Sequence, residues 1–456
     1  MTTPYIRFMN DSRAKALDTV HFETIDHNIS KYSEAFSRGK KQYSNLQLAR
    51  RRAGMKKYHV IEHLEDHLKA FEHNFAANGG KVVWALDAAE ARKAVIGILL
   101  QHQARVVVKS KSMVSEEIGL NEALSQQGIE SIETDLGEYI FQLTGDKPYH
   151  IVTPIMHRSA KDVARIFHEK FGLSENAEPE DVVDFVRDHL RDAFRGADAG
   201  ITGANFLISG SGSVALTENE GNGLLSVSMP RLHIVITGIE KIIASVEDLE
   251  LFWPLLSTHG TGQHITAYNS LISGPRAKNE KDGPEHMYVV LLDNRRSRLL
   301  GTLPQRRSLS CIRCGACLNV CPVYRHIGGH AYGTVYSGPI GAVISPHLLG
   351  NLDQYKHLSF ASTLCGKCTD VCPVGIDLHH QLLKNRRLSV SSRLTSRSER
   401  LLMWAYRYTM KKRSRLDRFS ARTKNALMRR FFAKAWGPGR ELPLADSMPA
   451  AKRLQK

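Results

Sequence analysis

The chain has 456 residues, of which 42% are hydrophobic, and it carries a formal net charge of +16. This length suggests two or three domains, and the apolar fraction is ample for a globular core. No apolar run approaches the ~20 residues of a membrane-spanning helix, and residues 1–17 lack the hydrophobic segment of a signal peptide. We therefore expect a cytoplasmic protein with reduced thiols and no integral membrane segment.

The N-terminal part of the chain is predicted to be helical. Residues 12–76 are polar, with no proline and few glycines. Two sets of apolar residues recur at spacings of three and four: Leu46, Ala49 and Ala53, then Val60, Leu64, Leu68 and Phe71. Many lysines and arginines surround the first set. We expect residues 1–76 to form a helical arm that packs through one face of its later helix.

From residue 81 the rhythm changes, because short β-branched runs alternate with helical stretches. Alternation of this kind predicts an α/β domain with a largely parallel sheet, over residues 77–300. The expected strands are residues 81–86, 105–109, 131–134, 150–153, 205–208, 214–216, 232–236 and 287–292. The expected helices are residues 89–101, 116–126, 161–171 and 179–194.

Several polar segments of this domain could bind a ligand. Residues 209–213 and 217–223 are glycine-rich, and Glu218 and Glu220 could act there as a base or a nucleophile. Turn formation explains these glycines equally well, and neither a dinucleotide fingerprint nor a Walker loop is present. Two lysines, Lys109 and Lys111, lie at the end of a predicted strand. Ligands bind at this place in α/β sheets, and a solvated strand end is equally plausible. Residues 259–264 form another glycine-rich loop, whose two histidines we do not expect to bind a metal.

All seven cysteines of the chain lie in two runs. Residues 311–322 read C-x2-C-x2-C-x3-C-P, the pattern of bacterial ferredoxins that bind iron–sulfur clusters. Residues 365–373 read C-x2-C-x3-C-P. The alternative is a zinc ribbon, which uses paired C-x2-C knuckles and needs neither a third evenly spaced cysteine nor the Cys-Pro pair. The pattern therefore predicts two iron–sulfur clusters.

The two predicted clusters differ in their number of thiolates. In two-cluster ferredoxins the fourth cysteine of a run serves the other cluster. By this rule cluster 1 is held by Cys311, Cys314, Cys317 and Cys372, and cluster 2 by Cys321, Cys365 and Cys368. A complete second run would have a cysteine at position 362, where this chain has Ser362. Cluster 2 is then either [3Fe–4S], or [4Fe–4S] with Ser362, a water or a partner's group as its fourth ligand.

The long segment between the runs suits an all-helical two-cluster module over residues 301–388 rather than a compact ferredoxin with β-hairpins. Within it, residues 336–343 contain glycine and proline, which would let the backbone pack close to a cluster or form a turn.

The C-terminal region, residues 389–456, is strongly basic. From residue 384 to the end there are 21 Lys and Arg but 4 Asp and Glu, so the whole charge excess lies here. Apolar residues recur at three and four: Leu401, Trp404, Ala405 and Tyr408, then Leu416, Phe419, Thr423 and Leu427. This predicts amphipathic helices with a basic outer face. They could pack on this or another protein, lie on a membrane surface, or bind nucleic acid, which we favour least because no RNA-binding motif is present.

Several segments together resemble the lactate utilization protein B family, the iron–sulfur subunit of a three-protein bacterial L-lactate oxidation system. They are residues 109–118, 133–138, 203–205 and 217–222, both cysteine runs and the basic region. The resemblance covers essentially the whole chain. It implies a lactate-utilization domain similar to CoA-transferases and ribose-5-phosphate isomerase, followed by a ferredoxin-type module. It also implies electron transport during oxidation of L-lactate to pyruvate, with the sibling A and C proteins as partners.

Three functions are compatible with these features. The cysteine distribution favours a non-catalytic electron-transfer subunit that passes electrons to an acceptor. A CoA-transferase-like enzyme would use Glu218 or Glu220, and an RNA-modifying iron–sulfur protein would use the basic region. No flavin or nicotinamide fingerprint is visible, so hydride chemistry would need another subunit or a pocket that the sequence does not reveal. We expect the first function.

Overall fold

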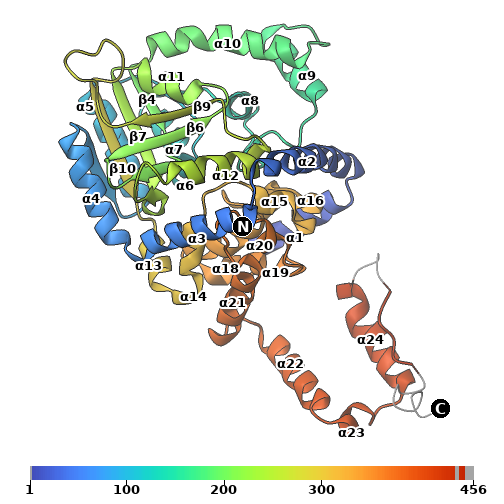
Figure 1. The fold of residues 1–456 in the computed structure, drawn as a ribbon. Helices are drawn as coiled ribbons and strands as arrows, with labels where there is room; N and C mark the ends of the chain where they lie inside the picture. Colours follow the sequence, from blue (N-terminus) through green and yellow to red (C-terminus); the bar gives the residue numbers. More distant parts are fainter. Residues whose placement is uncertain (1–2, 437–440, 447–456) are drawn as a thin grey trace. The chain divides into compact units, whose positions relative to one another are not determined.

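The computed structural model describes residues 3–436 and 441–446 of the chain. The chain forms two compact units, residues 1–388 and 389–456 (Figure 1).

The first unit begins with the predicted helical arm. Its helices are α1 (Pro4–Ala16), α2 (Thr19–Gly39), α3 (Leu46–Glu62) and α4 (Leu64–Ala77). Three of them start at a polar cap, because the side chains of Thr3, Asp18 and Asn45 each accept a hydrogen bond from a backbone N–H three residues on. The arm packs on the α/β domain, and the later apolar stripe predicted from the sequence lies buried at that contact.

The predicted parallel sheet is present and has six strands, in the order β1-β10-β7-β4-β2-β3. The strands are β1 (Lys81–Ala85), β2 (Val106–Lys109), β3 (Glu130–Glu133), β4 (Ala199–Thr202), β7 (Leu232–Gly238) and β10 (His286–Leu292). Strand β7 is buried along its whole length. Val235 and Val289 face α4 on one side, whereas Ile234 and Val290 face α5 (Ala88–Gln101) on the other. The period of two along these strands thus builds two apolar layers.

A second, four-stranded sheet was not predicted. Its order is β8-β5-β6-β9, with β5 (Phe206–Ile208), β6 (Ser213–Glu218), β8 (Ile242–Ile243) and β9 (Tyr268–Ile272). The glycine-rich residues 209–213 join β5 to β6 as a hairpin, and Gly212 takes a positive φ of 62°. This segment therefore makes a turn between strands.

Three local predictions were wrong. Residues 150–153 form an irregular bend rather than a strand, because the Nδ1 atom of His150 accepts the N–H groups of Val152 and Thr153. The helix predicted at 116–126 is two helices, α6 (Met113–Ile118) and α7 (Leu120–Gln126), separated by Gly119 at a φ of 62°. Residues 259–261 close the helix α12 (Leu249–Thr261) instead of lying in a loop.

Other helices agree with prediction or add to it. Helices α9 (Ala160–Phe171) and α10 (Pro179–Gly196) lie where the sequence predicts them. Three more complete this domain: α8 (Leu136–Thr144), α11 (Asn222–Ser228) and α13 (Arg296–Gly301).

Between residues 301 and 388, every regular element that the structure describes is helical, as predicted for the module. The main helices are α15 (Ala316–Asn319), α16 (Pro322–Ile327), α17 (Gly338–Leu348), α20 (Lys367–Val371) and α21 (Leu378–Ser391). Of residues 336–343, expected to pack close to a cluster or to form a turn, those from Gly338 onward begin α17, and Ile340 lines a cavity together with four cysteines. One apolar core joins Ile25 of the arm, Phe206 of the second sheet and Leu318 of the module, so these three parts form a single unit.

The second unit contains α22 (Arg397–Met410), α23 (Arg413–Leu416) and α24 (Ala421–Trp436). Helices were predicted here, and the predictions for residues 437–440 and 447–456 lie outside the described residues. The apolar stripe of α22 is exposed, with Leu401 at 66% and Trp404 at 63%. Among the described residues, no helix is long and apolar enough to cross a membrane.

Candidate functional site

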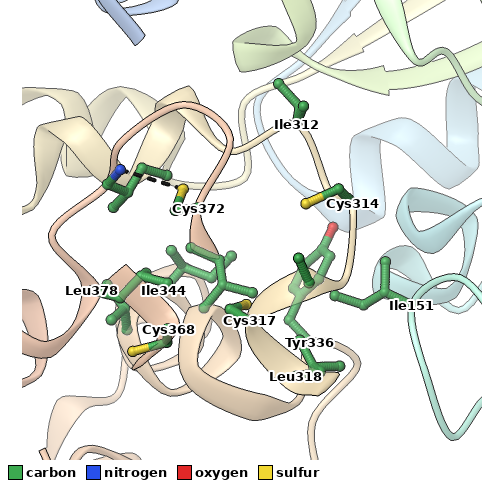
Figure 2. Packing of buried hydrophobic residues seen from close by; sticks show 14 of the residues in the cluster. Ile151, Ile312, Cys314, Cys317, Leu318, Tyr336, Ile344, Cys368, Cys372 and Leu378 are labelled. Atoms are coloured by element: carbon green, nitrogen blue, oxygen red, sulfur yellow. Dashed lines mark hydrogen bonds between the residues drawn. The ribbon is translucent and has the colours of Figure 1, made fainter. Parts of the chain in front are cut away.

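Four cysteines from the two runs surround one small cavity in the module. They are Cys311, Cys314, Cys317 and Cys372, called here the cluster 1 thiols. Figure 2 shows the sulfur atoms of Cys314 and Cys372 directed toward a common space, with Cys317 nearby. The rest of the wall is mostly apolar and includes Ile340 and Val374. The fourth cysteine of the first run, Cys321, does not line this cavity.

The remaining three cysteines, called the cluster 2 thiols, interact with one another. Burial, and then the charges of Cys321 and Cys365, raise the pKa of the Cys368 thiol to about 12. Burial also raises the pKa of Cys321, with a contribution from Cys365. Cys365 itself is exposed, whereas Cys321 and Cys368 are buried. The last cysteine of the first run therefore lies with the first two of the second.

The donor set fits iron–sulfur clusters. All seven thiols are free, and burial with neighbouring thiols raises the pKa of both Cys314 and Cys317, so such groups ionise together only beside positive charge such as iron. Two backbone N–H groups already point at sulfur: Arg313 N–H to Cys311 Sγ at 3.4 Å, and Ile376 N–H to Cys372 Sγ at 3.3 Å. In the described part of the chain, no three His, Cys, Asp or Glu are placed to share a single metal ion.

The two cysteine runs share one backbone turn. Positive φ angles flank the equivalent cysteines Cys314 and Cys365: Arg313 (61°) and Gly315 (75°) in the first run, Leu364 (56°) and Gly366 (83°) in the second. In the first run, the Arg313 N–H donates to Cys311 Sγ. In the second, the Leu364 N–H donates to Ser362 Oγ at 3.1 Å. The Ser362 hydroxyl thus holds the position that a thiol holds in the first run.

A second cavity, of about 410 Å³, lies at the carboxyl edge of the parallel sheet and is called the sheet-edge cavity. It is lined by the segments that follow three neighbouring strands, at residues 110–114, 203–205 and 240–241, and by residues 216–220. The module closes it with Arg313 and Tyr336. Ligands bind at this edge in many open α/β sheets.

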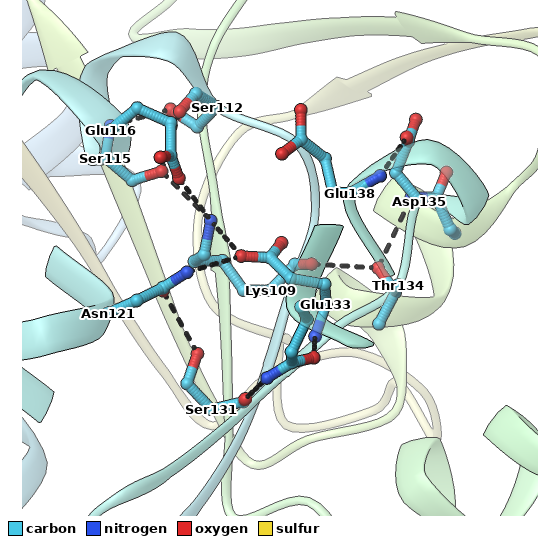
Figure 3. Close-up of polar contacts among 12 residues, drawn as sticks. Lys109, Ser112, Ser115, Glu116, Asn121, Ser131, Glu133, Thr134, Asp135 and Glu138 are labelled. Carbon is cyan, nitrogen blue, oxygen red and sulfur yellow. Dashed lines mark hydrogen bonds and ion pairs between the residues drawn. The ribbon is translucent and has the colours of Figure 1, made fainter. Parts of the chain in front are cut away.

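The predicted lysines have different surroundings. Lys109 is 1% exposed and does not line the cavity; its Nζ lies 2.8 Å from Glu133 and 3.7 Å from Glu116 (Figure 3). Burial alone would lower its pKa, but these carboxylates raise it. Lys109 is therefore a buried structural charge. It is neither a ligand-binding residue nor part of a solvated strand end, the two alternatives that the sequence left open. Lys111 does line the cavity, and its Nζ donates to the carbonyl oxygen of Val152 at 2.8 Å.

The two predicted glutamates also line the sheet-edge cavity. The carboxylate of Glu218 accepts the N–H groups of Gly223 at 2.7 Å and Leu224 at 2.8 Å, so it fixes the start of α11. Glu220 accepts the N–H of Leu136 at 3.2 Å, and burial followed by Asp135 raises its pKa to about 7. Glu220 is thus the more available of the two for proton exchange.

Sequence reasoning missed a buried charge network between the cavity and the module. Glu240 pairs with Arg296 at 2.6 Å and with Arg313 at 3.2 Å. Arg296 also pairs with Glu117 at 2.7 Å, and the Tyr336 hydroxyl donates to Glu117 at 2.6 Å. The sequence offered one signal, an arginine inside the C-x2-C pair. Its partners come from distant strands and helices, which spacing does not reveal.

The two other glycine-rich segments differ in their relation to these cavities. Residues 209–213 line neither cavity. Gly260 and Thr261, from the segment 259–264, line the sheet-edge cavity. His259 is 1% exposed, and its Nδ1–H donates to the Leu255 carbonyl oxygen at 2.8 Å, as expected of a structural histidine inside a helix.

Comparisons with known proteins agree with this architecture. The LUD domain family matches residues 68–292, and the 4Fe-4S dicluster domain family matches residues 307–376. Lactate utilization protein B of Macrococcus caseolyticus is 43% identical over 403 residues, covering 85% of this chain and 84% of that protein. The protein of the same name from Bacillus velezensis is 47% identical over 350 residues, covering 76% and 73%. A DUF162 family structure from Deinococcus radiodurans aligns over 50% of this chain and 98% of its own at 17% identity, with a TM-score of 0.29.

Proposed function

Because the chain belongs to the lactate utilization protein B family, we propose that it carries electrons through iron–sulfur clusters in a complex that oxidises L-lactate to pyruvate. The observation that carries this proposal is the division of the seven thiols into a set of four and a set of three, each drawn from both runs. Such clusters relay single electrons, while the protein supplies ligands and burial.

The ligand sets that we propose follow this division. Cluster 1 is a [4Fe–4S] cluster held by the cluster 1 thiols, an assignment supported by their common cavity. Cluster 2 is held by the cluster 2 thiols, an assignment supported by the contribution of Cys365 to the raised pKa values of Cys321 and Cys368.

For cluster 2 we propose a [4Fe–4S] cluster with Ser362 at the fourth position. The matching hydrogen bonds to Cys311 Sγ and Ser362 Oγ support this choice over [3Fe–4S]. Alkoxide or hydroxyl oxygen is a harder ligand than thiolate, so this corner of the cluster would release iron most readily.

We propose that the protein acts in the cytoplasm, with the sibling A and C proteins and an electron acceptor as its partners. If the protein contacts a membrane surface, we propose that the basic region 389–456 makes this contact. We also propose the functional division into residues 1–76, 77–300, 301–388 and 389–456.

The test is purification with the neighbouring proteins under anoxic conditions, followed by addition of L-lactate. We expect lactate-dependent reduction of the clusters, seen as bleaching of visible absorbance and new paramagnetic signals. The Cys311→Ala variant should lose the centre of cluster 1, and Cys365→Ala that of cluster 2. The assay contains no added electron acceptor. If the complex then forms pyruvate from lactate while both centres stay oxidised, the result contradicts the proposal.

A further inference from the structure

Two buried cations face the sheet-edge cavity with unused hydrogen-bond donors. Lys241 is 8% exposed and lines the cavity, and within the described residues its Nζ has neither a hydrogen bond nor an ion pair. Arg313 also lines the cavity; its guanidinium pairs with Glu240 and lies over the Tyr336 ring, and its Nη1 is buried with no hydrogen-bond partner among the described residues. Buried ammonium and guanidinium groups are costly unless acceptors satisfy them. An acceptor is therefore expected in the cavity beside them.

Other charged groups are buried around these two side chains. Four cations lie around this point: Lys57, Lys241, Arg296 and Arg313. The carboxylates of Glu117 and Glu240 face them, and the charge of Cys311, one of the cluster 1 thiols, also acts on three of them. Lys57 is satisfied by the carbonyl oxygens of Glu240 and Ile242, each at 2.6 Å. Of the four cations, Lys241 and Arg313 line the cavity.

The carboxylates in the lining restrict which anion fits. Glu218, Glu220 and Asp135 also line the cavity. These carboxylates disfavour a dianion such as phosphate, whereas a monoanion can place its charge at one end. A guanidinium offers paired donors that match a carboxylate. The volume of about 410 Å³ suits a small molecule.

The sheet-edge cavity shares a wall with the cavity of the cluster 1 thiols. Arg313 and Ile151 line both. The backbone of Arg313 takes a positive φ of 61°, an uncommon conformation for a residue with a side chain, and its N–H donates to Cys311 Sγ. A charge bound at the Arg313 side chain therefore lies next to the cluster 1 thiols.

We propose that the sheet-edge cavity is a binding site for a small monocarboxylate, held by Lys241 and Arg313, and that its occupancy tunes the reduction potential of cluster 1. The choice of 2-hydroxy and 2-oxo acids as its ligands rests on the proposed function. A bound anion favours the less negative, oxidised state of a neighbouring cluster. If the anion binds the oxidised state ten times more tightly, the potential falls by about 59 mV.

The test uses the full chain with both clusters, prepared anoxically without its partners. Calorimetric titrations with L-lactate, pyruvate and inorganic phosphate measure binding, and a redox titration measures the potential of cluster 1 with and without lactate. We expect saturable binding of lactate or pyruvate in preference to phosphate, and a lower potential with the carboxylate present. Lys241→Gln should weaken binding about tenfold or more, since it removes a charge-assisted hydrogen bond.

Lys69→Gln is the matched control, because Lys69 is 69% exposed and pairs only with the exposed Glu65 in the described structure. It should bind as the wild type does. Lys241→Met is a second variant, which keeps the apolar stem of the side chain. Binding by either variant tests the proposal, provided that the iron content of that variant matches that of the wild type.

Four results would overturn the proposal: no saturable carboxylate binding, equal binding by wild type and folded Lys241 variants, binding of phosphate alone, or a Lys241 variant that shifts the potential while lactate has no effect. The last result would mean that Lys241 balances the charge of the cluster and does not bind a carboxylate. None of these touches lactate-dependent cluster reduction in the assembled complex, so failure here and failure of the proposed function are distinguishable.

Discussion

Replacing Glu240 by glutamine should strongly destabilise the first unit. The carboxylate is 1% exposed and faces Arg296, which is fully buried, and Arg313. Burial alone would raise the pKa of Glu240, but the two arginines lower it to about 2 from an ordinary 4.5. This difference corresponds to about 3 kcal/mol of folding free energy, because one pKa unit is worth about 1.36 kcal/mol. Breaking a buried ion pair by removing one partner costs a similar ~3–5 kcal/mol.

The assay is urea unfolding of the cluster-loaded chain at pH 7, followed by circular dichroism and visible absorbance. Glu285→Gln is the control, since Glu285 makes ion pairs with Arg231 and Arg276 on the surface and should shift the midpoint little. The folded pKa of Glu240 is depressed, so its stabilisation is complete above pH 4.5 and is lost as the pH falls toward 2. The gap between wild type and Glu240→Gln should close in that window. A loss below about 1 kcal/mol at pH 7 would refute this account of the network.

Three further substitutions test other parts of the structure. Ser362→Cys should give cluster 2 a fourth thiolate, so iron analysis after brief air exposure should find less iron lost than in the wild type; equal loss would count against Ser362 as the fourth position. Gly238→Ala should lower the melting temperature, because the added Cβ would overlap both Glu240 and Arg296, and an unchanged melting curve would contradict this packing. Lys109→Met should cost about 3–5 kcal/mol in urea unfolding by leaving Glu133 unpaired, with iron content unchanged; loss of iron instead would show that the site is not purely structural.

The sequence predicted features that depend on local spacing. The alternation of β-branched runs with helical stretches indicates five of the six strands of the parallel sheet, and the runs are clearest in the inner strands β2 and β10, which are largely buried. The spacing of the second run also predicted Ser362 as the position equivalent to the first cysteine of a complete run, and the hydrogen bond from the Leu364 N–H to Ser362 agrees with this prediction.

Features that depend on distant partners were not predictable. Strand β8 has two residues, too few for any periodic pattern, and it exists because β5 pairs with it. The sequence of residues 150–153 predicts a strand, but in the structure the His150 ring accepts two backbone N–H groups of this segment and bends it. The charges of Glu240 and Lys241 follow a buried strand, where sequence alone does not show that Arg296 and Arg313 converge on them.

The crossing of ligands between the two runs is most directly tested by paramagnetic resonance spectra of dithionite-reduced Cys372→Ala, compared with Cys311→Ala and Cys365→Ala. Because Cys372 shares a cavity with Cys311, we predict that its loss removes the same signal as loss of Cys311 and leaves the signal of cluster 2 in place. A Cys372→Ala spectrum that instead matches that of Cys365→Ala would contradict the assignment of thiols on which the electron-transfer role depends.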